Sequence, residues 1–201
     1  MTTVSFTQMK QGTKADYQML SELEGPYLAK TCARVLLELE RQGKDSLDGY
    51  PVTRLEHALQ SATRAFQDGA NDDWIVAALL HDIGDGLAPQ NHDAMAAEII
   101  RPFVSEEVTW VIGHHGAFQM IYYAHHLPGW NPNERDQYKD HPCYQSAVDF
   151  CERWDQNCFD PKFKSQPLEF FAPFVERVFA RKAHAKEHLK SGTVVGLPTQ
   201  F

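Results

Sequence analysis

Apolar positions recur with helical spacing along most of the chain. In two stretches, residues 27–41 and 53–67, they fall on one helix face. The second stretch follows the spacing i, i+3, i+4, i+7, i+11, and the apolar positions of the two are Leu28, Val35, Leu36 and Leu39, then Leu55, Ala58, Leu59, Ala62 and Phe66. No stretch alternates with period two for long. The pattern predicts an all-α fold, a helical bundle.

Capping residues and helix breakers mark further helices. Asn71 or Asp72 can cap a helix through DWIVAALLHD, and Pro102 stops the short helix HDAMAAEII. Ser105 is a plausible N-cap for SEEVTWVIGHH, with acids in its first turn. We also expect a helix over YQSAVDFCERWD and one long amphipathic C-terminal helix over LEFFAPFVERVFARKAHAKEHL.

The remaining segments divide the chain into a core and its periphery. Residues 122–142 are rich in Pro, Gly and aromatic residues, so we expect a long loop there that can act as a lid. A length of 201 residues fits one domain, residues 1–201, with its core at about 50–180. Residues 1–20 and 191–201 are expected to be peripheral.

Composition limits the classes of binding partner and the cellular compartment that we expect. The formal net charge of −8 argues against nucleic acid or an anionic membrane surface as a partner. The chain has no apolar run of about 18 residues, as a membrane-spanning helix needs, and no apolar leader in MTTVSFTQMKQGTK. The four cysteines form no CxxC pair and suggest no disulfide framework. We therefore expect a cytoplasmic protein; its oligomeric state does not follow from the sequence.

The stretch ALLHDIGD, residues 78–85, raises a question of burial. An apolar run typical of a core ends in His81, Asp82 and Asp85. Burying ionisable groups is unfavourable by several kcal/mol unless a partner compensates them. A metal ion is one such partner, and the chain contains ten histidines against five methionines.

Further candidate ligands lie on separate predicted helices. They are His57, His92, the pair His114 and His115, and Asp155. Each lies in or beside a helix with an apolar face, so the side chains can converge inside a bundle, as they do in di-metal carboxylate proteins. Asp82 has two oxygens and can bridge two ions. Imidazoles with carboxylates suit iron, manganese, zinc or other first-row divalent ions. A single buried histidine is more often a hydrogen-bonded core residue, but the joint pattern favours metal binding.

The order H…HD…H…H…D on an all-α chain resembles the HD-domain superfamily, which contains metal-dependent phosphohydrolases and a smaller branch of di-iron oxygenases. The stretch LEHALQSATRAFQDGANDDWIVAALLHDIGD looks like phosphonate-catabolism oxygenases of this branch, as do NHDAMAAEII, CERWDQ and PLEFFAPFVERVF. Myo-inositol oxygenase is a more distant relative. The resemblance implies a mixed-valent Fe(II)/Fe(III) site that cleaves the carbon–phosphorus bond of a 1-hydroxyphosphonate with O₂.

The same resemblance implies the ligand set. One iron is held by His57, His81, Asp82 and Asp155, and the other by Asp82, His92 and either His114 or His115. Counting from Ser105 without a gap favours His115, whereas other HD proteins with an adjacent pair favour the first histidine. We lean towards His115.

Three positions depart from the phosphonate-cleaving relatives. Where those proteins place basic residues around the anion, this chain has Asp85, Gln119 and Glu152. Asp85 can instead bond backbone at a helix end, and Glu152 can face solvent. Cations from the loops, namely Lys139, Arg153, Lys162 and Lys164, can replace the lost charge. Taken together, the three changes predict a neutral or cationic substrate.

Two segments add candidate roles beside the metal ligands. The loop FQMIYYAHHLPGW can form an aromatic wall over the metals, with Phe118, Tyr122, Tyr123, His125, His126 and Trp130, or can simply fold onto the bundle. Asp85 is a candidate base or substrate ligand beside the bridging Asp82, and these two are the candidate catalytic residues.

Two enzyme classes therefore compete. The first is a non-haem di-iron oxygenase that uses O₂ to cleave a C–C or C–P bond of a small hydroxylated substrate. The second is a hydrolase that uses the same ligands with Mn²⁺, Mg²⁺ or Zn²⁺ to attack a nucleotide or another phosphate ester. A hydrolase would need Arg or Lys near the metals, and the sequence indicates none next to the motifs. That absence favours the oxygenase, and a regulatory metal-binding module is a weaker third reading.

Overall fold

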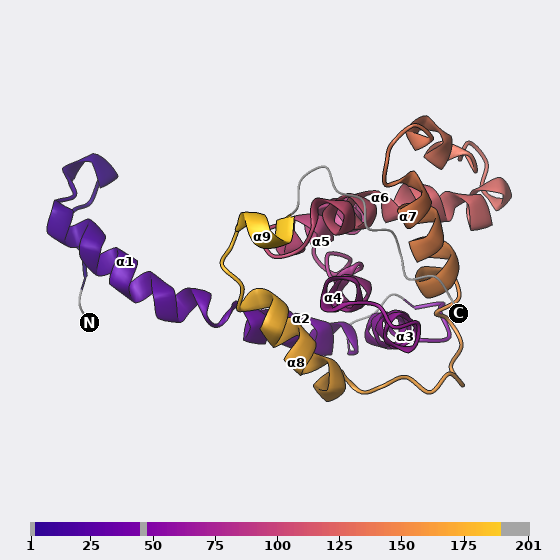
Figure 1. The fold of residues 1–201 in the computed structure, drawn as a ribbon, viewed down its shortest axis with the longest axis horizontal. Helices are drawn as coiled ribbons and strands as arrows, with labels where there is room; N and C mark the ends of the chain where they lie inside the picture. The colour runs from indigo at the N-terminus through magenta and orange to yellow at the C-terminus, as the bar shows by residue number, and fades with distance from the viewer. Residues whose placement is uncertain (1–2, 45–47, 190–201) are drawn as a thin grey trace.

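The computed structural model describes residues 3–44 and 48–189, and these residues form helices and no strand (Figure 1). The all-α prediction is confirmed. The α-helices are α1 (Lys14–Leu28), α2 (Thr31–Gln42), α3 (Arg54–Gln67), α4 (Asp72–Leu80), α5 (His92–Ile100), α6 (Glu106–Tyr123), α7 (Tyr144–Phe150), α8 (Leu168–Phe179) and α9 (Lys186–Leu189). The other helical segments are η1 (Met9–Gln11), η2 (Pro89–Asn91), η3 (Ala124–His126), η4 (Glu134–Tyr138) and the π-turn η5 (Cys151–Asp155).

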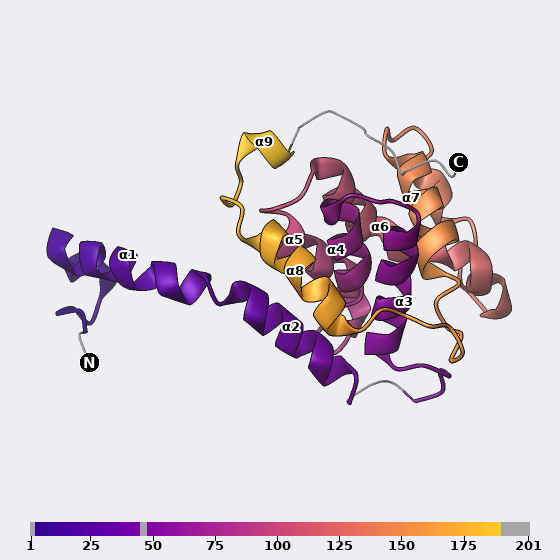
Figure 2. The same ribbon diagram turned by 60° about the horizontal axis from the view of Figure 1, so that its bottom comes forward.

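Helix α4 lies at the centre of the bundle, with α3, α6 and α8 packed against it (Figures 1 and 2). Every residue from Trp74 to Leu80 is buried, as expected for a helix that is apolar all round. Asn71 caps the helix by accepting a hydrogen bond from the backbone N–H of Trp74, 3.2 Å away. The helix that leads to His81 and Asp82 therefore runs through the core.

The N-terminal part differs from the prediction. The expected helix over residues 27–41 is two helices, because α1 ends at Leu28 and α2 begins at Thr31. Helix α1 extends away from the bundle in both ribbon views (Figures 1 and 2), and residues 20–30 are all exposed. Leu28, expected to face a core, is 57% exposed. The peripheral region thus reaches beyond residue 20, whereas Val35 and Leu39 of α2 are buried.

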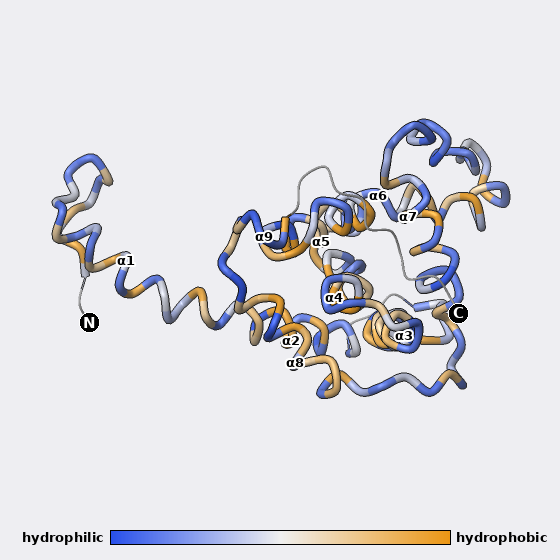
Figure 3. Tube along the Cα trace, viewed as in Figure 1, coloured by the Kyte–Doolittle hydropathy of each residue, from blue (hydrophilic) through white to orange (hydrophobic). Residues whose placement is uncertain are grey.

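The segment 122–142 is only partly a loop. Helix α6 continues to Tyr123, and η3 and η4 follow it. Figure 3 shows mostly hydrophilic residues along the segment after α6, which explains why it lies at the surface instead of in the core. The loop was expected to start at about residue 122, but the aromatic Tyr122 and Tyr123 still belong to α6.

The long C-terminal helix was also predicted wrongly. Helix α8 ends at Phe179, and α9 is a separate short helix after a turn in which His184 has a φ of 58°. Arg181 donates to Asp73 at 2.6 Å and to the carbonyl of Phe103 at 2.7 Å. These contacts turn the chain back onto the bundle. Residues 191–201, expected to be peripheral, lie outside the described residues. None of the described helices combines the length and apolarity needed to cross a bilayer.

Candidate metal centre

Side chains from five parts of the bundle meet beside the end of α4. His81 and Asp82 follow α4 directly, and the other members are His57 from α3, His92 at the start of α5, His115 from α6 and Asp155 at the end of the π-turn. His57, His81, Asp82, His115 and Asp155 are buried, and the His92 side chain is 26% exposed. The elements are far apart in sequence, yet the bundle brings their polar side chains to one place.

One group of side chains, here called the closed half, consists of His57, His81, Asp155 and Oδ2 of Asp82. Oδ1 of Asp155 lies 3.3 Å from Nε2 of His57 and 3.5 Å from Nε2 of His81. Oδ2 of Asp82 lies 3.6 Å and 3.7 Å from the same two nitrogens. Ligand atoms that share a first-row ion at about 2.1 Å stand about 3 Å apart, so these spacings suit one ion.

The other group, here called the open half, consists of His92, His115 and Oδ1 of Asp82. Nε2 of His92 and Nε2 of His115 each lie 3.3 Å from Oδ1 of Asp82. Asp82 therefore points one oxygen at each half. A carboxylate in this position can bridge two ions, which is the role that the sequence predicts for it.

Backbone hydrogen bonds select the same tautomer in all four imidazoles. Each Nδ1 lies 2.7–3.2 Å from a backbone carbonyl oxygen, which can only accept, so Nδ1 carries the hydrogen and Nε2 presents a lone pair. The pairs are His57 with Cys158, His81 with Ala78, His92 with Pro89 and His115 with Ile112. Metal-binding histidines are commonly oriented in this way.

Two further observations fit a cation in the closed half. Nε2 of His57 and Nε2 of His81 are only 3.0 Å apart, although both nitrogens would present lone pairs. Oδ2 of Asp155 is buried and has no hydrogen-bond partner. Close lone pairs and an unpaired buried oxygen are unfavourable unless a positive charge lies between them. The donor set of nitrogens and carboxylate oxygens therefore fits a first-row metal ion.

The cluster shifts the pKa values of its members in opposite directions. Burial opposes a charge on His57, but its bond to Asp155 and the charge of Asp82 outweigh burial and raise the pKa of the imidazole. Burial likewise opposes ionisation of Asp82, but His81 and His115 hold its pKa well below the usual range. The pKa of Asp155 is also lowered, because His81 and His57 outweigh its burial. Both carboxylates are thus anions at neutral pH, as metal ligands must be.

Local structure positions Asp82 tightly. A Cβ on Gly84 would lie 2.7 Å from the carbonyl oxygen of His92, so only glycine lets this turn approach the start of α5. The buried Gln42 of α2 donates to the carbonyls of Asp82 and Ile83 at 3.3 Å and 3.0 Å. No local sequence pattern indicates the role of Gln42, because its partners are 40 and 41 residues away.

The π-turn η5 ends at Asp155. The backbone N–H of Gln156 bonds the carbonyl of Cys151 at 3.0 Å, five residues back. Such turns are rare and occur often at functional sites, because the extra residue changes the direction in which the following side chains project. Here the π-turn directs Asp155 towards His57 and His81.

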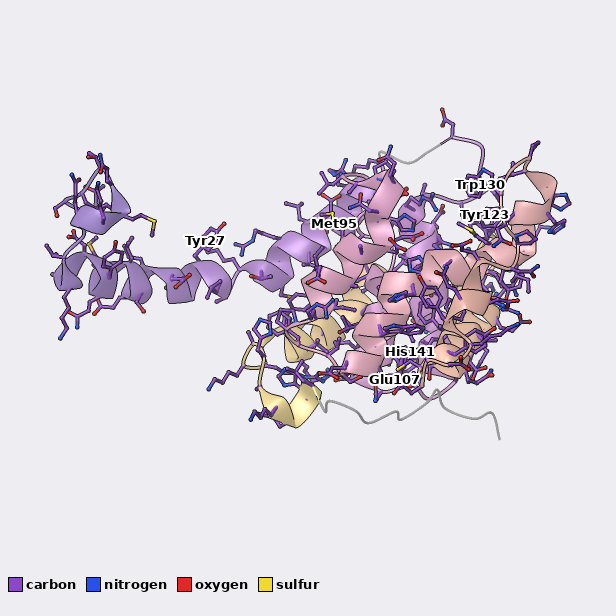
Figure 4. All side chains as sticks on the ribbon, turned by 90° about the horizontal axis from the view of Figure 1, so that it is seen from above. Tyr27, Met95, Glu107, Tyr123, Trp130 and His141 are labelled. Carbon is purple, nitrogen blue, oxygen red and sulfur yellow. The ribbon has the colours of Figure 1, made fainter. Side chains whose placement is uncertain are left out.

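The two adjacent histidines of α6 have different surroundings. His115 belongs to the open half, whereas His114 bonds the carbonyl of Trp110 at 2.7 Å and stacks on the Trp110 ring at 4.3 Å. The structure therefore brings His115 together with the other candidate ligands and leaves His114 on another side of the helix. His114 lines a separate surface cavity together with Glu107 and His141, which lie close together in Figure 4.

A cavity of about 380 Å³ opens onto both halves of the centre. Besides candidate ligands, its wall contains Tyr50, Arg54, Gly116, Gln119, Tyr122, Tyr123, Gln156 and Phe159. The aromatic wall that the sequence suggested is thus present in part, through Tyr122 and Tyr123. Phe118 is buried against other rings, and Trp130 lies beside Tyr123 at the surface (Figure 4), with ring centroids 6.0 Å apart. His125 and His126 pack against each other.

Of the three residues expected to contact the substrate, one lines the cavity and two do not. Gln119 lines the cavity, but Asp85 and Glu152 are not among the described residues that line it. Oδ2 of Asp85 lies 2.8 Å from Nε of Arg54, and Glu152 accepts a hydrogen bond of 2.6 Å from the Tyr122 hydroxyl. Burial, and then this bond, raise the pKa of Tyr122.

The expectation that no Arg or Lys adjoins the candidate ligands is wrong. Arg54 lines the cavity, and its Nη1 lies 3.4 Å from Oδ2 of Asp82. A local signal was present, because residues three apart share a helix face and Arg54 precedes His57 by three. The pairing of Arg54 with the segment after α4 spans 28 residues and more, so it was not visible in the sequence.

Comparison with known proteins agrees with this description. Residues 54–147 match the family described as HD domain, in agreement with the resemblance seen in the sequence. The matched range includes every member of the two halves except Asp155.

Two curated relatives are dioxygenases. One is a 1-hydroxy-2-(trimethylamino)ethylphosphonate dioxygenase (glycine-betaine-forming) from Leisingera caerulea, 36% identical over 89 residues, which are 39% of this chain and 45% of the relative. The other is a hydroxymethylphosphonate dioxygenase from Gimesia maris, 36% identical over 86 residues, which are 37% of this chain and 43% of the relative. The chain thus aligns with less than half the length of these curated relatives.

Proposed function

We propose that this chain, which matches the HD domain family over residues 54–147, is a non-haem di-iron oxygenase that uses O₂ to cleave a C–C or C–P bond of a small hydroxylated substrate. The observation that carries the proposal is Asp82, which points one oxygen at each half of a cluster with four histidines. Similarity to two dioxygenases supports it.

We assign one iron to His57, His81, Asp155 and Asp82, and the other to Asp82, His92 and His115. When bound, the irons would supply Lewis acidity towards a substrate oxygen and the electrons for O₂ chemistry. The protein holds the shared carboxylate as an anion and keeps the closed half buried from water. The cavity borders both halves, but the partly exposed His92 makes the open half the more accessible one, so we place the substrate there, where it is oriented before reaction.

The cavity wall points to the substrate's substituents. Aromatic faces such as those of Tyr50, Tyr122, Tyr123 and Phe159 can hold a quaternary or protonated amine. The name of the Leisingera relative joins a trimethylamino group to a phosphonate. Asp85 is ion-paired with Arg54, and Glu152 does not line the cavity, so of the three changed positions only the uncharged Gln119 faces the substrate. We propose a neutral or cationic hydroxylated compound and treat a 1-hydroxyphosphonate as the outcome that would correct this choice.

The central experiment is metal analysis and EPR spectroscopy on protein expressed with iron, together with measurement of O₂ uptake. We expect about two irons per chain and a coupled mixed-valent signal, which small hydroxylated amines perturb. The substrate panel pairs choline-like alcohols with 1-hydroxyphosphonates that do or do not carry a trimethylamino group. Iron-free protein, or iron-loaded protein without O₂ uptake on any member of the panel, would contradict the proposal.

A phosphohydrolase is the second candidate, and Arg54 is the observation that favours it. A guanidinium at the cavity wall can bind a phosphate ester, while Mn²⁺, Mg²⁺ or Zn²⁺ in the same ligands activates water. Phosphate release from nucleoside monophosphates that is unaffected by removal of oxygen would establish this reading. Phosphate release that is absent while O₂ is consumed would exclude it.

A further inference from the structure

An ion pair lies beside the bridging carboxylate. Arg54 is the first residue of α3, and its Nε is 2.8 Å from Oδ2 of Asp85. Its Nη1 is 3.4 Å from Oδ2 of Asp82, and its guanidinium lies 5.1 Å from the centre of the Tyr50 ring. The side chains of Arg54, Asp82 and Asp85 are 17%, 11% and 18% exposed. Solvent therefore screens these charges only in part.

Both members of the pair are held by segments that also carry candidate ligands. Arg54 lies one helical turn before His57. Asp85 closes the turn after α4, where its N–H bonds the carbonyl of Asp82 at 3.0 Å. The distance of the pair from Asp82 is thus built into the same backbone that positions His57 and Asp82.

The pair has a direct electrostatic consequence for a cation at Asp82. A positive guanidinium beside Oδ2 repels a metal ion in the closed half and competes for the oxygen's lone pairs. Asp85 has the opposite charge, is ion-paired with the same guanidinium, and offsets this repulsion. Removing either member alone should change metal affinity, and the two removals should act in opposite directions.

We propose that Arg54 and Asp85 act as a positioning pair that sets how tightly the closed half binds its ion. This role is additional to the ligand assignment made above, and it rests on the proposed metal centre. Neither residue is a ligand in it. Arg54 lowers the affinity of the carboxylate for metal, and Asp85 restores part of it.

The test is equilibrium binding of Mn²⁺ to the metal-free chain, followed by the EPR signal of free Mn²⁺. We expect Arg54→Gln to tighten one of two binding constants by about tenfold, which corresponds to about 1.4 kcal/mol. Asp85→Asn should weaken the same constant by about as much, and the double variant should return to within about threefold of wild type if the two charges cancel. Arg54→Lys keeps the charge and should stay near wild type.

Matched controls remove the same charges elsewhere. Arg64→Gln acts on the same helix, where Arg64 bonds the carbonyl of Asn157 at 3.1 Å, and Asp140→Asn acts at the surface. Neither should change Mn²⁺ binding, and thermal melting shows that each variant is folded. Weaker binding in both Arg54→Gln and Asp85→Asn would identify a merely structural pair and overturn the inference, as would unchanged binding in both. Wild-type protein that binds no ion would instead overturn the metal centre itself.

Discussion

The two halves of the candidate centre share Asp82 but differ in their relation to solvent. In the closed half, His57, His81 and Asp155 are all buried, and Oδ2 of Asp155 has no hydrogen-bond partner. In the open half, His115 is buried, but His92 is 26% exposed, and the cavity borders both halves. We infer that the closed half serves to retain an ion, whereas the open half leaves coordination positions for small molecules.

The largest expected effect comes from removing what the halves share. Asp82→Ala should lose both ions. Without Asp82, the open half keeps only two neutral imidazoles, and the closed half keeps two imidazoles and one carboxylate. Inductively coupled plasma analysis of purified protein measures this. Near-full metal content in Asp82→Ala would show that Asp82 is not a bridge and that the halves are independent.

Variants that remove a ligand from only one half should lose the ion of that half and keep the other. His57→Ala removes a ligand from the closed half only, so about one ion per chain should remain, and His92→Ala should likewise spare the closed half. We expect the ion kept by His92→Ala to resist dialysis against a chelator longer, because its ligands are buried. If the two variants lose metal at the same rate, burial does not distinguish the halves.

The adjacent histidines of α6 give a narrower test. His115→Ala should lose the ion of the open half, while His114→Ala should keep the metal content of wild type. His114 instead packs on Trp110, with ring centroids 4.3 Å apart. Each variant is therefore the control for the other, and the reverse result would move the ligand by one residue.

Much of this arrangement was predictable from sequence, for identifiable reasons. Periodicity in α3, polar caps at α4 and α6 and the proline after α5 made these helices predictable, and all candidate ligands except Asp155 lie within or next to them. The break between α1 and α2 was missed because apolar Leu28 continues the pattern although it faces solvent. The end of α8 was missed because Arg181 is bound by Asp73 and by a backbone carbonyl, far away in sequence.

The candidate ligands were visible in the sequence, whereas the residues that hold the segment carrying Asp82 were not. The ligand types were visible because histidines and acids next to apolar runs are unusual. Gln42 was not, because an ordinary polar residue on a helix has no local signal for a partner 40 residues away. Arg54 shares a helix face with His57, but nothing local indicated that it pairs with Asp82, 28 residues away. Sequence patterns thus indicated the chemistry of the site but not the contacts that hold its shared carboxylate.

Gln42 offers a test of those supports. Gln42→Ala leaves the carbonyls of Asp82 and Ile83 without this donor, and should lower the free energy of unfolding by about 1–3 kcal/mol. The variant should also lower the binding affinity for both ions, because the turn that carries Asp82 is held less firmly. The matched control is Gln60→Ala, whose buried amide donates to the carbonyl of Asp160 at 2.9 Å. That variant should lose similar stability with unchanged metal content, as measured by urea unfolding and metal analysis.

The smallest effect is expected at the wall of the cavity, where the Tyr122 hydroxyl donates to Glu152 at 2.6 Å. Tyr122→Phe should lower the free energy of unfolding at pH 7 by about 0.5–1.5 kcal/mol, the usual contribution of such a bond. Because burial and Glu152 raise the pKa of Tyr122, its contribution is present below the unfolded pKa of about 10 and declines as pH rises above it. Urea unfolding of both proteins at pH 7 and at about pH 10.5 should therefore show their difference shrinking. Metal content should stay at the wild-type level, since Tyr122 belongs to neither half. Loss of one ion in Tyr122→Phe would mean that the open half extends into the cavity wall, and the boundary drawn here between ligands and wall would have to move.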